Sequence, residues 1–160
     1  MVSPGQHRPT ARVILRNAKN EVFMLLTHFD PEVGLPPRWL TPGGGIDAGE
    51  TALQAAVREL FEETGIRVTP EALGEPIWST MGRWDWADGN HHTYEDVFFE
   101  YEVSEFDLDD SNWTTDEFRD VLKYRWWNIT ELANSGESVA PHGLVEFLQN
   151  HYLTDLPKRR

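Results

Sequence analysis

The amino-acid sequence predicts an α/β fold, a sandwich in which helices cover both sides of a mixed β-sheet. Three observations lead to this fold class. Short apolar or alternating runs, which are typical of strands, are separated by turn residues. One longer segment, residues 51–64, combines good helix formers and a periodic apolar set with a following glycine. No repeat or Pro/Gly-rich linker divides the 160 residues, so we expect a single domain over residues 1–160.

The other elements are predicted from the same kinds of pattern. Residues 8–16 alternate in side-chain character, and a turn at residues 17–20 connects them to the apolar run 22–26, which predicts a strand pair. Further strands and a closing helix are predicted at residues 39–41, 76–81, 94–103, 123–127 and 143–152. We expect loops in the segments that are rich in Pro, Gly, Asp or Asn, which are residues 28–38, 82–92 and 104–119.

The composition is strongly acidic. The chain has 27 Asp and Glu residues against 14 Lys and Arg residues, which gives a formal net charge of −13. Nucleic-acid binding relies on Lys and Arg side chains that displace counterions from phosphates, so we expect no long DNA or RNA partner. The sequence has no cysteine, which excludes disulfides, thiolate metal sites and a Cys nucleophile.

The sequence contains no predicted membrane span or secretion signal. No run approaches the ~18 consecutive apolar residues of a membrane helix. The N-terminal residues lack the apolar centre of a signal peptide. We therefore expect a cytoplasmic protein without a membrane partner.

The segment Gly43 to Ile66 carries most of the chemical information. Its three leading glycines can turn backbone carbonyls and amides toward a ligand. In the helix that follows, we expect the apolar side to dock on the sheet, and this side contains Leu53, Val57, Leu60 and Phe61. The opposite side presents three glutamates and, one turn earlier, small residues past which a loop or ligand can approach, namely Ala52, Ala55 and Ala56.

The three glutamates, Glu59, Glu62 and Glu63, have two interpretations. A Glu-rich helix face is most often simply solvated, but such faces usually pair Glu with Lys or Arg one turn away. Here Glu59 faces Glu63, and Arg58 only flanks this side. A like-charge pair destabilises a helix by roughly 0.2–0.5 kcal/mol, so we expect a cation at this face. A hard divalent ion such as Mg²⁺ suits carboxylate oxygens.

The same segment resembles the signature of the Nudix hydrolase family. The match includes every defined position of the family's sequence box, which here are Gly44, Glu50, Arg58, Glu59, Leu60, Glu62, Glu63, Gly65 and Ile66. The resemblance implies a Nudix-type αβα sandwich with a mixed β-sheet. It also implies a hydrolase that uses Mg²⁺ or Mn²⁺ to cleave a nucleoside diphosphate linked to another group.

The resemblance further implies roles for individual residues. The metal ligands would be three side chains and one backbone carbonyl, from Glu59, Glu62, Glu63 and Gly43. Arg58 would orient these carboxylates, and Glu50 would support it. Among these residues, we expect Glu62, Glu59 and Arg58 to be the catalytic ones.

Hydrolysis of a pyrophosphate also requires a group that takes a proton from the attacking water. A box glutamate can do this, but related enzymes also place a carboxylate in a late loop, and residues 104–120 contain several. Among them we favour Glu117. The alternative is that Glu117 is an ordinary solvated acid at the start of a helix.

Cationic and aromatic residues outside the box are candidates for contacts with the substrate. Arg12 and Arg38 are either phosphate contacts or plain surface cations. Trp84 and Trp86 lie in a predicted loop, where an aromatic ring can stack on a base. The alternative for each tryptophan is ordinary packing.

Together these patterns predict a hydrolase that cleaves the pyrophosphate linkage of a small nucleotide by attack of water on phosphorus. One alternative is a Nudix module that senses a nucleotide without cleaving it, although such modules commonly lose box carboxylates. Another is an acidic interaction domain without a ligand, which leaves the glutamate face unexplained. The identity of the nucleotide and the existence of a homodimer stay open at this point.

Overall fold

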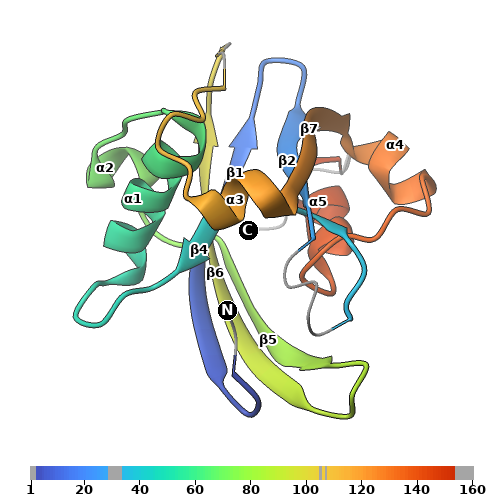
Figure 1. The fold of residues 1–160 in the computed structure, drawn as a ribbon. Coiled ribbons are helices and arrows are strands. Elements are labelled where there is room, and N and C mark those ends of the chain that lie inside the picture. Colours follow the sequence, from blue (N-terminus) through green and yellow to red (C-terminus); the bar gives the residue numbers. More distant parts are fainter. Residues whose placement is uncertain (1–2, 29–33, 105, 107, 154–160) are drawn as a thin grey trace.

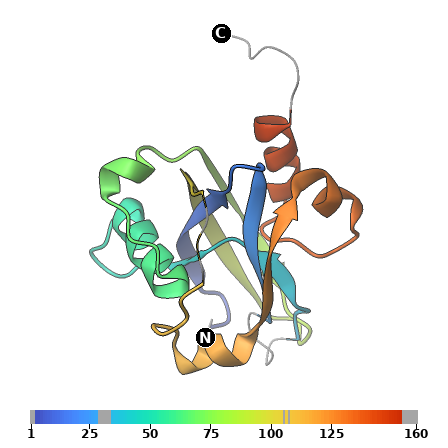
Figure 2. The same ribbon diagram turned by 90° about the horizontal axis from the view of Figure 1, so that it is seen from above.

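A computed structural model describes residues 3–28, 34–104, 106 and 108–153 of the chain. The elements in these residues are β1 (His7–Arg16), β2 (Glu21–Thr27), β3 (Arg38–Leu40), β4 (Gly43–Gly45), α1 (Ala52–Thr64), α2 (Pro70–Leu73), β5 (Trp78–Asp85), β6 (His91–Glu102), α3 (Thr115–Asp120), β7 (Val121–Asn128), α4 (Ile129–Asn134) and α5 (Leu144–Tyr152). Figures 1 and 2 show α1 and α2 on one side of the sheet and α4 and α5 on the other. The predicted α/β sandwich is therefore confirmed.

Strand β1 is the centre of a mixed, seven-stranded sheet with the order β3-β2-β1-β6-β5. It pairs in parallel with β6 along its whole length. Its other edge is shared, because β4 pairs with residues 10–12, whereas β2 pairs at Arg16 opposite Val22. Strand β2 continues with β7 and β3 as its partners. The first half of β1 is therefore separated from β2, and the sheet is split at this point.

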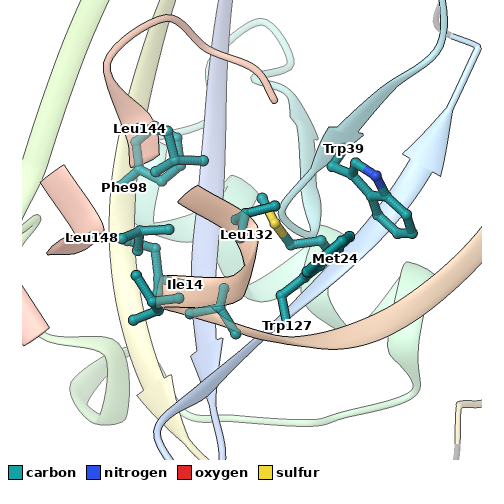
Figure 3. Close-up of a cluster of buried hydrophobic side chains, with 10 residues drawn as sticks. Ile14, Met24, Trp39, Phe98, Trp127, Leu132, Leu144 and Leu148 are labelled. Carbon is teal, nitrogen blue, oxygen red and sulfur yellow. The ribbon is translucent and has the colours of Figure 1, made fainter. Parts of the chain in front are cut away.

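Side chains of β1 alternate between two cores, as residues 8–16 predict. Ala11 and Val13 belong to a cluster with Leu60 of α1. Ile14 points to the other side and belongs to a cluster with Leu148 of α5, which Figure 3 shows. Residues 13–15 are apolar on both faces because helices cover both faces of the sheet, whereas the first half of β1 has Arg8, Thr10 and Arg12 on the face of Ile14.

Helix α1 begins and ends where the sequence predicts. The Thr51 side chain accepts a hydrogen bond from the Gln54 amide, and the Gln54 side chain accepts one from the Thr51 amide, which forms a capping box. Gly65 ends the helix with a φ of 83°, a left-handed conformation that favours glycine. With 13 residues, α1 is the longest helix of the described chain, in which no helix is long and apolar enough to cross a membrane.

The face of α1 that packs on the sheet is the predicted one in part. Leu60 is fully buried in the cluster with β1, and Leu53 and Val57 pack against this cluster, whereas Phe61 belongs to none of the core clusters of the described residues. Ala55 and Ala56, which we expected to leave room for a ligand, are instead fully buried in the cluster with β1. Small side chains allow the helix to lie close to the strand. Side-chain size was therefore a misleading guide to the docking face.

Two predicted loops contain regular structure. Strand β5 extends to Asp85 and β6 begins at His91, so segment 82–92 is mostly a hairpin. Segment 104–119 includes most of α3, which has no apolar period in its six residues and begins at a second capping box. The elements β4, α2 and α4 are also absent from the prediction because each is short. Within the predicted loop 28–38, residues 29–33 lie outside the described residues.

Candidate active site

A cavity of about 400 Å³ opens where the sheet divides, between the first half of β1 and the neighbouring β2. Figure 1 shows β4 beside α1, with α3 lying across the front of the sheet. The charged residues that line the cavity are Arg8, Arg12, Arg58, Glu59, Glu62, Glu63, Asp116, Glu117 and Asp120. The fold thus brings the predicted metal ligands together with Arg12 and Glu117, although these residues come from distant segments of the sequence.

The glycines of β4 allow this strand to lie directly against α1. A Cβ atom on Gly44 would lie 2.6 Å from the carboxylate carbon of Glu59, so a larger residue would displace that carboxylate. A Cβ atom on Gly43 would lie 2.5 Å from the carbonyl oxygen of Ala11. The amide of Gly43 donates a hydrogen bond of 3.4 Å to Glu63 Oε2. The role of the Gly43 carbonyl as a metal ligand stays a prediction.

Arg58 lies among the carboxylates and donates hydrogen bonds to three of them, while Asp47 Oδ2 lies 3.5 Å from its Nη2. Its Nε and Nη2 donate bonds of 2.8 Å to the two carboxylate oxygens of Glu50. Its Nη1 donates to Glu59 Oε1 at 2.8 Å and to Glu62 Oε2 at 3.3 Å. Nη2 also donates to the carbonyl of Gly45 at 3.0 Å, which connects the helix to β4. Arg58 and Glu50 therefore occupy the positions from which they can orient the other glutamates.

The electrostatics of this cluster are uneven. Hydrogen bonds from Arg58 lower the pKa of Glu50 to about 2. Burial raises the pKa of Glu63 well above its ordinary value, and the charges of Glu59 and Glu117 raise it further. Burial likewise raises the pKa of Glu59, against the opposing hydrogen bond from Arg58. The charge of Arg12 at Glu63 and the hydrogen bond from Arg58 at Glu59 thus do not compensate the burial of these two carboxylates.

Glu117 lies at the start of α3 and also lines the cavity. Its side chain closes the capping box, because Oε1 accepts a hydrogen bond of 3.0 Å from the Thr114 amide. Its charge acts on both Glu59 and Glu63. The two interpretations of Glu117 are therefore compatible: it caps a helix, and it places a carboxylate beside the glutamates of α1.

The donor chemistry of the cavity fits a hard divalent cation. Its lining combines six carboxylates with three guanidinium groups, and carboxylate oxygens are the ligands that Mg²⁺ prefers. Among the described residues, however, no three carboxylate or imidazole groups converge closely enough to hold an ion. Arg58 Nη1 instead bridges Glu59 and Glu62. The second carboxylate oxygen of Glu59 and of Glu62 is not bonded to Arg58, so an ion held there would not have to displace this guanidinium.

A smaller pocket of about 30 Å³ adjoins the cavity and contains a cluster of arginines. The two spaces share the lining residues Arg8, Arg12 and Leu40. The guanidinium of Arg38 also lines this arginine pocket and lies 4.2 Å from the centroid of the Trp84 ring. The predicted substrate residues Arg12, Arg38 and Trp84 are thus brought together.

The arginines of this pocket are buried cations close to one another. Burial, and then the charge of Arg12, lower the pKa of both Arg8 and Arg38 to about 10. Arg12 Nη1 donates to the carbonyl of Thr41 at 3.0 Å, and its Nε lies 4.0 Å from Asp96 Oδ1. Sequence reasoning missed Arg8, although alternation along β1 places it on the same side of the strand as Arg12.

Trp86 has a different role from Trp84. Its ring is buried, and its Nε1 donates a hydrogen bond of 2.8 Å to Nδ1 of His92. This contact and the neighbouring Leu35 place Trp86 in a small core cluster. The expectation that Trp86 stacks on a base is therefore wrong, and ordinary packing describes it.

Comparison with known proteins agrees with this geometry. A sequence model described as a NUDIX domain matches residues 6–147. The chain is 53% identical to an RNA pyrophosphohydrolase of Rhizobium meliloti over 75 residues, which are 45% of this chain and 45% of that protein. It is 41% identical to Nudix hydrolase 25 of Arabidopsis thaliana over 78 residues, 48% of this chain and 41% of that protein. The chain thus spans less than half the length of these relatives.

Solved structures share the fold at low sequence identity. A MutT protein from Methanosarcina mazei superposes with a TM-score of 0.66 over 93% of this chain and 95% of that one, at 18% identity. The E. coli dihydroneopterin triphosphate pyrophosphohydrolase superposes with a TM-score of 0.62 over 94% and 99%, at 20% identity. These structures support the fold alone. Because the NUDIX domain match extends over residues 6–147, the chain belongs to the Nudix family, and its curated relatives are hydrolases by name.

Proposed function

We propose that the protein is a divalent-metal-dependent hydrolase that cleaves the pyrophosphate linkage of a small nucleotide. The observation that carries this proposal is that the cavity and the arginine pocket adjoin each other and share Arg8 and Arg12 as lining residues. Carboxylates that attract a cation therefore adjoin guanidinium groups that attract phosphate. A polyphosphate with its bound metal ion has charges that complement both.

In this proposal Mg²⁺ or Mn²⁺ is held by the glutamates of α1 and by one carbonyl of β4, which are Glu59, Glu62, Glu63 and Gly43. When bound, the ion lowers the pKa of a water molecule and offsets charge on the phosphate oxygens. Arg58 fixes the direction of the Glu59 carboxylate through its bond of 2.8 Å. Glu50 holds Arg58 in turn through two bonds of 2.8 Å.

The remaining residues bind the substrate and move the proton. Arg12 and Arg38 contact the phosphates, since planar guanidinium groups bind phosphate oxygens in pairs. Trp84, already stacked with Arg38, supports the base. We assign Glu117 as the acceptor of the proton from water, with Oε2 as the accepting atom because Oε1 already binds the Thr114 amide.

A second candidate substrate is the 5′ end of an RNA. It is favoured by the name of a relative, the RNA pyrophosphohydrolase of Rhizobium meliloti. The net charge of −13 opposes contacts with a long phosphate backbone, so we place a small nucleotide first. The non-catalytic sensing module is a weaker candidate, because every box carboxylate is present.

A released-product assay tests these candidates together. The purified protein is incubated with Mg²⁺ or Mn²⁺ and a panel of nucleoside triphosphates, nucleotide sugars, dinucleoside polyphosphates and 5′-triphosphorylated RNA. We expect release of phosphate, pyrophosphate or a nucleoside monophosphate from a small nucleotide, and loss of this release in excess EDTA. Full turnover in EDTA contradicts the metal requirement. Tight binding without turnover favours the sensing module, and turnover of RNA alone favours the second substrate.

A further inference from the structure

A second hollow, of about 460 Å³, lies on the outer side of α1. Residues of α1, of the segment after it and of the segment before α3 form its walls, chiefly Val57, Phe61, Arg67, Val68 and Asn112. This outer hollow and the cavity share Arg58, Glu62 and Thr114 as lining residues. It therefore adjoins the proposed catalytic site at the wall formed by α1.

The outer hollow contains a flat, stacked pair of side chains. The guanidinium of Arg67 lies 3.8 Å from the centroid of the Phe61 ring. Phe61 is only partly buried, and among the described residues it belongs to none of the hydrophobic core clusters. Arg67 is exposed. The pair therefore presents a planar cationic surface that the packing of the core does not explain.

We propose that the outer hollow binds a nucleobase of the substrate, stacked on the Arg67–Phe61 pair. Aromatic rings and guanidinium planes both stack on bases. Val57 and Val68 supply apolar contacts at the edges of the hollow, and the Asn112 amide can both donate to and accept from a base edge. This inference rests on the proposed function, because the phosphates attached to that base would occupy the cavity.

The position of the outer hollow indicates a substrate with two bases. The arginine pocket, where Trp84 lies, joins the cavity through Arg8 and Arg12 of β1, whereas the outer hollow joins it through Arg58 and Glu62 of α1. One base at each end leaves the phosphates between the carboxylates and the arginines. The second base can belong to a dinucleoside polyphosphate or to the second nucleotide of an RNA 5′ end.

Kinetics with substrates that have one or two bases test this inference. We compare ATP, diadenosine tetraphosphate and the triphosphorylated dinucleotide pppApG for the wild type, Arg67→Ala and Phe61→Ala, after melts show that the variants are folded. The matched control is Arg125→Ala, which removes an arginine stacked 3.6 Å from the Trp127 ring centroid on β7. For one of the two-base substrates we expect KM to rise about tenfold in both hollow variants, as loss of base stacking implies.

The KM for ATP should stay within about twofold in the same variants, because the second base is missing. A selective effect on diadenosine tetraphosphate identifies a base across the phosphate chain, and one on pppApG identifies an RNA end. Equal changes for all substrates, or no change for any, overturn the inference.

Calorimetry in EDTA separates this inference from the proposed function. If the wild type releases no product from any member of the nucleotide panel described above, the proposed function fails. The hollow is then tested by binding of diadenosine tetraphosphate and of pppApG: weaker binding of either to Arg67→Ala than to Arg125→Ala supports the base site, and equal binding of both overturns it.

Discussion

The two charged sides of the cavity are built in opposite ways. The carboxylate side comes from consecutive turns of a single helix, with Glu59, Glu62 and Glu63. The arginine side consists of Arg8 and Arg12 from β1, which the adjoining arginine pocket combines with Arg38 from β3, a strand that is not a neighbour of β1 in the sheet. Each side crowds groups of like charge into a partly dehydrated space, which disfavours their charged forms.

The pKa shifts show the same cost on both sides with opposite sign. Burial raises the pKa of Glu63, because a carboxylate loses its charge on protonation. Burial lowers the pKa of Arg38 to about 10, because a guanidinium carries its charge when protonated. Under the proposed function, a metal ion beside the glutamates and a phosphate beside the arginines would offset these two costs. The following predictions test whether the two sides act separately in this way.

The largest expected effect is on turnover. Glu62→Gln should lower kcat by about 10²-fold or more, as loss of a metal ligand does. The fold should persist, since the replacement is isosteric and the Glu62 side chain is 38% exposed. Steady-state kinetics measure this, with Glu146→Gln on the exposed side of α5 as the matched control. If Glu62→Gln keeps the kcat of the wild type, the glutamates of α1 form only a solvated helix face.

The next effect is on stability and its dependence on pH. Because the folded pKa of Glu50 is lowered to about 2, its stabilisation is present above the ordinary value near 4.5 and is lost as pH falls toward 2. Glu50→Gln should cost about 1.5–3 kcal/mol of unfolding free energy near neutral pH, as expected for hydrogen bonds to a charged group. Urea unfolding should show that the difference in unfolding free energy between the wild type and the variant shrinks as the pH falls across this range. If this difference in unfolding free energy is the same at every pH, the ion pair is not its cause.

On the arginine side, Arg38→Lys should impair binding more than catalysis. Lysine keeps the charge but loses the planar group that stacks on Trp84 at 4.2 Å. We expect KM to rise about tenfold and kcat to stay within about twofold. The rise in melting temperature with Mg²⁺ should match that of wild type. If kcat falls while KM is unchanged, the separation between the two sides is wrong.

The smallest effect is expected for the like-charge pair. Glu63→Gln removes the repulsion with Glu59, which is worth about 0.2–0.5 kcal/mol in a helix. Without metal the variant should melt at or above wild type, and its rise with Mg²⁺ should shrink because the folded state binds the ion more weakly. Melts at low ionic strength, with and without Mg²⁺, measure both shifts. If the variant melts at a much lower temperature without metal and keeps the full rise with Mg²⁺, Glu63 is not a metal ligand.

The ends of α1 and the position of its glutamates on one face could be predicted from the sequence alone. The ends of α1 depend on residues three positions apart, Thr51 with Gln54, and on one glycine, Gly65. Glu59 and Glu63 face the same way because the helical period places them one turn apart. Such relations are local, so they can be predicted without knowing the topology. The position of Arg58 beside Glu62 follows from the same period.

The buried face of α1 and the contacts between distant residues could be seen only in the tertiary structure. Ala55 and Ala56 are buried because β1 lies close to that face, and nothing in their local pattern indicates the approach of a strand. Arg12 of β1 and Arg38 of β3 line the same small pocket, although β2 lies between their strands in the sheet. Contacts between separate elements depend on how the strands are ordered, and a short stretch of sequence carries no information about that order.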